Sequence, residues 1–232
     1  MAKLLGDRLT FVAPDLPCHG RSPDMDALDA FSTTVFDSTL AMMDSAPMDV
    51  IGHSFGAMTA LRLAARFPER IRTLTLFEPV FFAVARADAP ETLAAHDHDT
   101  AHFREAADAG DMETAARAFN EMWSSGPSGW DALSERARQA MVRGIRVVPT
   151  TYALLYDDTD GILAPGVLDR VSMPVQLIRG ALTHAAISST LAGLQTRLPD
   201  AALDVIPDAG HMAPISHPAE VAALFEKVLA RA

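Results

Sequence analysis

The sequence predicts an α/β domain, with a mostly parallel sheet flanked by helices and a helical insertion between its two halves. Three observations predict this class. Strand-like and helix-like segments alternate near both ends of the chain, a long helical stretch without strand signals separates them, and 232 residues suffice for one domain with an insertion. We therefore assign residues 1–83 and 172–232 to the core and residues 84–171 to a helical cap, or lid.

Each expected strand is a short apolar or alternating run that ends at Pro, Gly or a charged residue. In chain order these runs are residues 9–13, 49–51, 71–77, 174–178 and 203–206. Parallel strands present their carboxyl ends at one edge of the sheet, and ligands of open α/β sheets bind there. The loops that follow the strands are therefore the first places to look for chemistry.

The expected helices show Ala-, Leu- and Arg-rich composition or amphipathic spacing. They cover residues 27–43, 57–66, 111–122, 130–147 and 218–229. Gly126-Pro127-Ser128-Gly129 predicts a turn between the two helices of the insertion. Because the insertion enters between two core strands, we expect it to lie over the carboxyl edge of the sheet.

Composition and charge exclude several classes of function. Lys and Arg total 19 against 30 Asp and Glu, and the net charge of -11 repels phosphate backbones and anionic lipid, so we expect neither a nucleic-acid nor a membrane partner. Cys18 is the single cysteine, which excludes an internal disulfide framework. The apolar stretch at 74–85 is broken by Glu78 and Pro79, and no signal-peptide core is visible, so we expect a cytoplasmic protein.

Gly52-His53-Ser54-Phe55-Gly56 is the sharpest local motif. It follows a predicted strand and precedes a predicted helix, which is the context of a strained turn that exposes a nucleophilic serine. We expect glycine on both sides of this motif because the tight turn leaves little room for side chains. The N-terminus of the following helix favours negative charge at Ser54.

A serine hydroxyl needs a base to act as a nucleophile, and His211 is the candidate. It lies in a loop after the last predicted strand, at the same edge of the sheet as Ser54. Three other histidines cluster with two aspartates, at His96, Asp97, His98, Asp99 and His102. The group could bind a metal ion, but only the histidines at positions 98 and 102 share a helical face, so we expect an exposed acidic face there and no metal. We expect no cofactor.

The order of strand, serine turn, helical insertion and late Gly-His loop resembles the α/β-hydrolase superfamily. Four segments are similar to that family's loop after its fourth strand, its nucleophile elbow, the end of its sixth strand and its histidine loop, at residues 15–22, 52–56, 78–79 and 210–214. The resemblance implies that Ser54 is the nucleophile and His211 the base. It also implies that the backbone amide of Phe55 donates to the oxyanion.

The acid of the triad departs from the family pattern. The family usually places an Asp in the loop after its seventh strand, where this chain has Thr183 and His184. Some members that resemble haloalkane dehalogenases take the acid from the end of the sixth strand, where Glu78 stands. We therefore choose Glu78, which fits the family's chain order of nucleophile, acid and base. The alternatives are a purely structural Glu78, Asp208 as the acid, or no acid at all.

The beginning of the chain also departs from the pattern. Family members start with two or three more strands, and one of these ends in His-Gly and supplies a second oxyanion donor. Without that strand, edges of the sheet are left unpaired. We therefore expect the working protein to have a longer start, and the alternative is a different strand order that closes the gap. Cys18 replaces a usual glycine, which is strained if this position has a positive φ, while a buried thiol is the simpler interpretation.

Together these features predict a serine hydrolase that cleaves a small apolar ester, thioester, lactone or C–C bond through an acyl-enzyme. Phe81, Phe82 and Trp123 are the candidate substrate-binding residues, with core packing as the alternative for Trp123. A small molecule is the expected partner. Two other functions stay open: a catalytically silent binding protein with this fold, and a cofactor-free haloperoxidase-like activity that uses the same residues.

Overall fold

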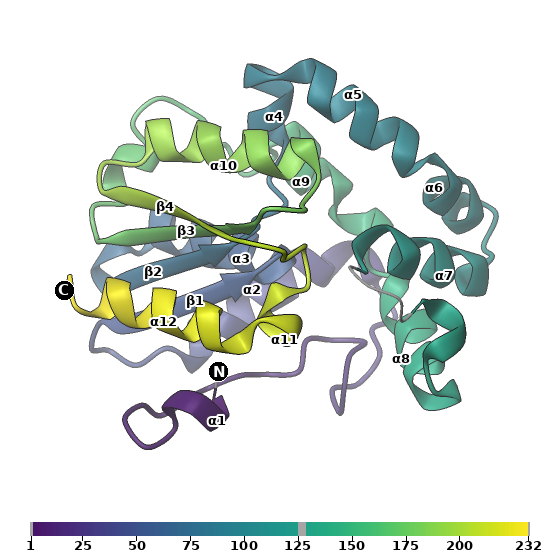
Figure 1. Ribbon diagram of the computed structural model, residues 1–232, viewed down its shortest axis with the longest axis horizontal. Coiled ribbons are helices and arrows are strands. Elements are labelled where there is room, and N and C mark those ends of the chain that lie inside the picture. The colour runs from purple at the N-terminus through teal and green to yellow at the C-terminus, as the bar shows by residue number, and fades with distance from the viewer. Residues whose placement is uncertain (1, 125–128, 232) are drawn as a thin grey trace.

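The computed structural model describes residues 2–124 and 129–231, and it confirms the α/β class (Figure 1). Within this part of the chain the sheet has four parallel strands, each beside the next in sequence: β1 (Met48–His53), β2 (Ile71–Phe77), β3 (Val175–Gly180) and β4 (Ala201–Ile206). The carboxyl ends of all four therefore meet at one edge of the sheet.

Helices pack on both faces of this sheet. Those that belong to the two ends of the chain are α1 (Ala2–Leu5), α2 (Phe31–Met42), α3 (Phe55–Arg66), α10 (Ala185–Arg197), α11 (Ala213–Ser216) and α12 (Pro218–Leu229). Side chains alternate along the strands, so the sheet divides its apolar residues between two cores. Leu74 and Leu76 join the larger core with α3 and α10, whereas Phe77 and Ile178 join a smaller core with α12.

Between β2 and β3, the described chain forms helices and turns without a strand. The helices are α4 (Phe82–Asp88), α5 (Pro90–Asp99), α6 (Ala101–Asp108), α7 (Met112–Trp123), α8 (Glu135–Ile145) and α9 (Tyr152–Asp157). Figure 1 shows that they gather beyond the end of the sheet where the strands finish. Side-chain caps explain two of their starts, because Asp111 accepts from the amide of Thr114 and Ser134 from that of Ala137.

Four of the five expected strands are confirmed, and the expected strand at residues 9–13 is wrong. This segment has no strand partner among the described residues. Leu9 and Phe11 instead pack their side chains against a small apolar cluster that includes Leu5 and Phe225. An apolar, alternating run becomes a strand only when a neighbouring strand supplies hydrogen bonds, and in the described part of the chain β1 pairs with β2 alone.

Two helix expectations need correction. Residues 130–147 do not form one helix: a 3-10 turn at Trp130–Ala132 precedes α8, because Ser134 caps a new start. Residues 27–43 likewise divide into a 3-10 turn at Leu28–Ala30 and α2. The turn expected at residues 126–129 lies, for its first three residues, outside the described part of the chain.

None of the helices in the described ranges is long and apolar enough to cross a lipid bilayer.

Candidate active site

Ser54 occupies a sharp turn between β1 and α3. Its backbone has φ 56° and ψ -121°, a conformation that costs free energy for any residue with a Cβ. The amide of Ser54 donates to the carbonyl of Phe77 at 3.0 Å, which extends the pairing of β1 with β2 up to the turn. The amide of Phe55 begins α3, where the first N–H groups of a helix have no partner within the helix. A donor and a hydroxyl thus meet at the end of β1.

The two glycines of this motif have different roles. A Cβ at Gly52 would lie 2.4 Å from the carbonyl oxygen of Gly56 and 2.6 Å from Cα of Ala57, so the turn has no room for a side chain there. A Cβ at Gly56 would meet no atom within 4 Å. The expectation of crowding is therefore confirmed for Gly52 and wrong for Gly56, because the helix has already turned away from the strand at that point.

Glu78 directly follows β2 and is fully buried, with a positive φ of 46°. Its carboxylate accepts three hydrogen bonds: from the amide of Gly180 at 2.8 Å, from the hydroxyl of Thr183 at 2.7 Å and from Nδ1 of His211 at 2.7 Å. Buried carboxylates need such partners to keep their charge. Thr183 lies in the loop where the family usually places its acid. In this chain its hydroxyl donates to Glu78, which follows a different strand.

His211 lies in the loop between β4 and α11, with 6% of its surface exposed. Because a carboxylate accepts and does not donate, the bond to Glu78 places the proton on Nδ1 of His211. Nε2 is then the free lone pair that can take a proton from a substrate or a hydroxyl. A Cβ at Gly180 would lie 2.1 Å from the carbonyl oxygen of Ala209, so glycine is required where β3 approaches the histidine loop.

His53 holds the same loop from the other side. Its Nε2 lies 2.9 Å from the carbonyl oxygen of His211, and since a carbonyl accepts, Nε2 carries the proton. Burial, and then the nearby His211, lower the pKa of His53 to about 3, so His53 is neutral at physiological pH. Sequence reasoning missed His53 and Thr183. For His53 the available signal was its place as the last residue of β1, beside the serine.

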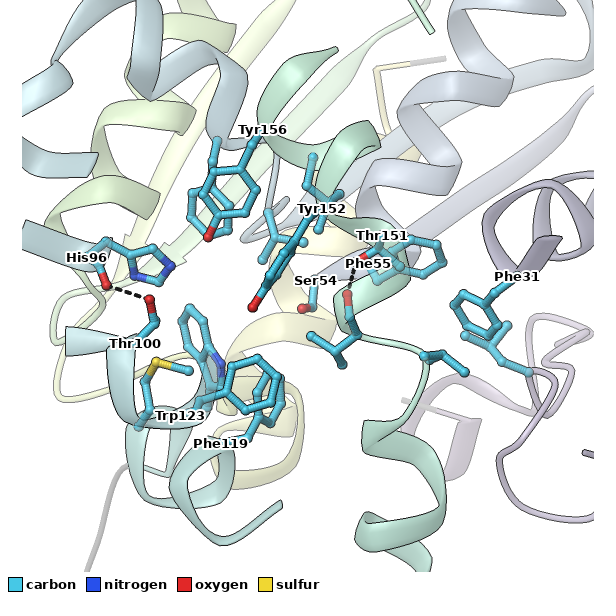
Figure 2. Close-up of a pocket in the computed structure, with 18 of the residues that line it drawn as sticks. Phe31, Ser54, Phe55, His96, Thr100, Phe119, Trp123, Thr151, Tyr152 and Tyr156 are labelled. Carbon is cyan, nitrogen blue, oxygen red and sulfur yellow. Dashed lines mark hydrogen bonds between the residues drawn. The ribbon is translucent and has the colours of Figure 1, made fainter. Parts of the chain in front are cut away.

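A cavity of about 220 Å³ opens in front of Ser54, between the sheet edge and the helical stretch (Figure 2). Phe55 from α3, Phe82 from α4 and Trp123 from α7 line it together with Ser54. Phe82 and Trp123 are two of the three expected substrate-binding residues. Phe81 is not among the residues that line the cavity. Its side chain is fully buried in the larger core, because successive residues at the start of α4 point in different directions.

Trp123 also contacts the histidine. Its ring centroid lies 4.3 Å from that of His211, and Trp123 lines both the cavity of Ser54 and a neighbouring pocket that His211 borders. Within the described residues no hydrogen bond joins the hydroxyl of Ser54 to His211. Trp123 thus lines the cavity of Ser54 and at the same time contacts the ring of His211.

Cys18 and His96, two further residues singled out in the sequence, are both buried. Cys18 has a φ of 63° and a fully buried side chain, so it is both strained and enclosed. His96 stacks on Phe82 with ring centroids 4.5 Å apart, and it lines the cavity. Among the described residues, no three His, Cys, Asp or Glu side chains come together in a way that could hold a metal ion.

Comparison with known proteins gives consistent matches over nearly the whole chain. The family model described as "Alpha/beta hydrolase family" matches residues 1–224. A pimeloyl-[acyl-carrier protein] methyl ester esterase from Aromatoleum aromaticum is 32% identical, over 93% of this chain and 86% of that protein. Lipase LipV from Mycobacterium tuberculosis is 30% identical, over 95% of this chain and 84% of its own length.

Solved structures agree with the sequence matches on the fold. A thermophilic esterase from Thermogutta terrifontis superposes with a TM-score of 0.69 at 20% identity, covering 99% of this chain and 83% of that one. An enzyme titled 2-hydroxy-6-oxo-6-phenylhexa-2,4-dienoate hydrolase, from a Rhodococcus species, superposes with a TM-score of 0.66 at 19% identity, covering 98% of this chain and 82% of that one. At these identities the likeness concerns the fold alone.

Proposed function

The chain belongs to the alpha/beta hydrolase family and is a hydrolase of the carboxylic-ester type, and from this premise we propose that Ser54, His211 and Glu78 are its catalytic triad. The observation that carries the proposal is the 2.7 Å bond between Glu78 and Nδ1 of His211, made at the sheet edge where Ser54 also lies. A nucleophile, a base and an acid that orients the base are the parts that acyl transfer requires.

In the proposed reaction, Nε2 of His211 takes the hydroxyl proton of Ser54 while Oγ forms a bond to the ester carbonyl carbon. The resulting oxyanion accepts a hydrogen bond from the amide of Phe55. His211 then gives the proton to the leaving alcohol as the C–O bond breaks. Water attacks the acyl-enzyme with His211 again as base, and the acid product leaves. Nucleophile–base contacts are often long without substrate and tighten in the complex, which is consistent with the lack of a hydrogen bond from Ser54 to His211 within the described residues.

Glu78 serves as the acid although it comes from β2. It holds the Nδ1 proton, so that Nε2 is unprotonated, and it stabilises the imidazolium that forms during both steps. Its bonds to Gly180 and Thr183 keep the carboxylate from rotating away. No carboxylate is then required in the loop after β3.

Residues 84–171 serve as the cap in this proposal. The cavity supports it, because Ser54 and Phe55 of the core face Trp123, Tyr152 and other residues of the helical stretch across the cavity. Its walls are mostly aromatic and aliphatic, so the acyl part of the substrate is small and largely apolar. The methyl ester named for the relatives makes methyl esters of short acids the first substrates to assay.

Covalent labelling by a fluorophosphonate probe, read by intact mass, tests the triad. We expect one adduct on the unmodified protein, none on Ser54→Ala, and a loss of methyl ester turnover of about 10⁴-fold or more in that variant. Ser216→Ala is the matched control, because Ser216 is an exposed serine near the same loop. A folded protein that gains no adduct, or a Ser54→Ala protein that still gains one, contradicts the proposal. The first result favours the silent binding protein instead.

A further inference from the structure

Buried polar atoms of the cavity in front of Ser54 have no hydrogen-bond partner in the part of the chain that the structure describes. His96 is 3% exposed and Trp123 is 7% exposed, and among the described residues neither Nδ1 of His96 nor Nε1 of Trp123 has a hydrogen-bond partner. Both residues line the cavity. A buried polar atom without a partner costs about as much as a lost hydrogen bond, and proteins rarely keep one unless something else fills the place.

Two tyrosines add hydroxyls to the same part of the cavity. Figure 2 shows the hydroxyl ends of Tyr152 and Tyr156 and the ring of His96 turned toward a common region. Neither hydroxyl makes a hydrogen bond to another described residue. The two rings contact each other with centroids 5.4 Å apart, and Tyr156 also packs on Phe82 at 4.8 Å. The hydroxyls are therefore fixed in position while their hydrogen-bonding capacity is unused.

All of these groups are uncharged at neutral pH. Burial, followed by the nearby His184, lowers the pKa of His96 to about 4, and burial raises the pKa of Tyr152 to about 12. A neutral His96 offers one N–H donor and one acceptor nitrogen. No Asp, Glu, Lys or Arg is among the described residues that line the cavity. The cavity can satisfy an uncharged polar group but cannot pair a carboxylate.

We propose that His96, Tyr152 and Tyr156 form a polar subsite that binds an uncharged hydrogen-bonding group, such as a ketone, ester or amide carbonyl, within the acyl chain of the substrate. This inference rests on the proposed function, because it assigns the acyl chain to the cavity of Ser54. It predicts a substrate that is apolar along its sides and carries a carbonyl some distance from the scissile ester. A plain alkyl chain leaves the buried donors unpaired, and a carboxylate is buried without a cation.

The test compares methyl esters of equal length that differ at one position. The probes are methyl heptanoate, methyl oxoheptanoates with the ketone moved stepwise along the chain, and monomethyl pimelate as the carboxylate. We expect at least one oxoheptanoate to exceed methyl heptanoate in kcat/KM by about tenfold, the discrimination that one satisfied hydrogen bond supplies. Monomethyl pimelate is expected to be the poorest of the set.

Variants assign the preference to the subsite. His96→Leu and Tyr156→Phe are expected to reduce the ratio of kcat/KM for the best oxoheptanoate over methyl heptanoate toward one. His98→Leu is the matched control, since His98 is an exposed histidine on the same helix, and it is expected to keep the ratio. Tyr156→Phe removes one oxygen and keeps the ring, so the test remains decisive if His96→Leu does not fold.

The outcomes separate this inference from the proposed function. A protein that takes the fluorophosphonate and cleaves methyl heptanoate as well as every oxoheptanoate keeps its function and loses the subsite. The same holds if the preference survives both His96→Leu and Tyr156→Phe. A protein that takes no fluorophosphonate fails at the triad instead.

Discussion

The carboxyl edge of the sheet and the cavity beneath the helical stretch treat buried polar atoms in opposite ways. At the sheet edge, the carboxylate of Glu78 has three donors around it, and the imidazole it holds is fixed again through its backbone by His53. In the cavity, His96 and Trp123 each have a buried nitrogen without a hydrogen-bond partner within residues 2–124 and 129–231. The two regions are adjacent: the ring centroids of Trp123 and His211 lie 4.3 Å apart.

The difference separates positioning from recognition. A network in which every member has a partner is rigid, and it holds catalytic groups in one geometry. Polar atoms without partners do not fix the position of any other protein group, and they form a hydrogen bond only when a ligand binds. The first arrangement is needed where a proton moves, and the second where a substrate is chosen. Three substitutions test this contrast. The largest effect is expected for the hydrogen-bonded network around Glu78.

Glu78→Gln is expected to lower kcat by about 10⁴-fold with a small change in KM. Three donors converge on the two carboxylate oxygens, and a glutamine offers one acceptor oxygen and one NH₂ group, so at least one donor meets another donor. Steady-state kinetics on a methyl ester measure the effect. Asp208→Asn is the control, since Asp208 is the other acid near His211, and it should stay within about threefold. Equal losses of kcat in both variants would contradict the role of Glu78 as the triad acid.

Gly180→Ala is expected to destabilise the protein by about 1–3 kcal/mol, because overpacking forces the backbone to shift. The added Cβ would lie 2.1 Å from the carbonyl oxygen of Ala209, which belongs to the loop that carries His211. Gly56→Ala makes the matched comparison: its Cβ meets nothing within 4 Å. Replacing a helical glycine with alanine there should be neutral or stabilising by up to about 1 kcal/mol. Urea unfolding of the two variants decides, and a Gly180→Ala protein as stable as the unmodified one contradicts the close approach.

Because His96 is buried and neutral in the cavity, we expect the stability of the protein to fall at acidic pH. His96 has a pKa of about 4 in the folded protein against 6.5 for an ordinary histidine, so between these values the unfolded chain binds a proton that the folded one does not. Stability therefore falls as pH falls through this window, with a slope of up to about 1.4 kcal/mol per pH unit. His53, with a pKa of about 3, contributes in the same direction.

Urea unfolding of the unmodified protein and of His96→Phe, between about pH 5 and 7, measures this slope. The variant is expected to lose less stability on acidification because it lacks His96, one of the two histidines whose pKa burial lowers. Parallel pH dependences for the two proteins would mean that His96 is not held neutral by burial.

Local sequence was enough to locate the three residues of the proposed triad. Ser54, Glu78 and His211 each follow a strand, and strand ends are recognisable from short apolar runs. The sequence placed all three at one edge because parallel strands share their direction. Trp123 and Phe82 were identified as cavity candidates for a simpler reason, namely their size and their position in or beside the insertion.

What sequence reasoning could not supply depends on contacts between distant segments. His53 and Thr183 have no motif of their own, and their roles exist only because the histidine loop packs against β1 and the loop after β3 faces Glu78. Residues 9–13 alternate like a strand, yet pairing is decided by a neighbour and not by the run itself. Phe81 and Phe82 are indistinguishable by composition, and the direction of α4 separates them.

The proposed origin of the triad acid, at the end of β2, has a consequence for how this site can evolve. Ser54 and Glu78 lie within one strand–helix–strand unit, residues 48–78, so recombination or domain insertion elsewhere in the chain leaves the two together. The loop after β3 is released from supplying a carboxylate and needs to retain a backbone amide at Gly180 and a hydroxyl at Thr183. Serine at position 183 preserves that hydroxyl, and any residue at position 182 leaves the amide of Gly180 in place. Under the proposed triad, most substitutions in this loop therefore leave the acid in place, and the loop beside the pocket can change without a change in the triad.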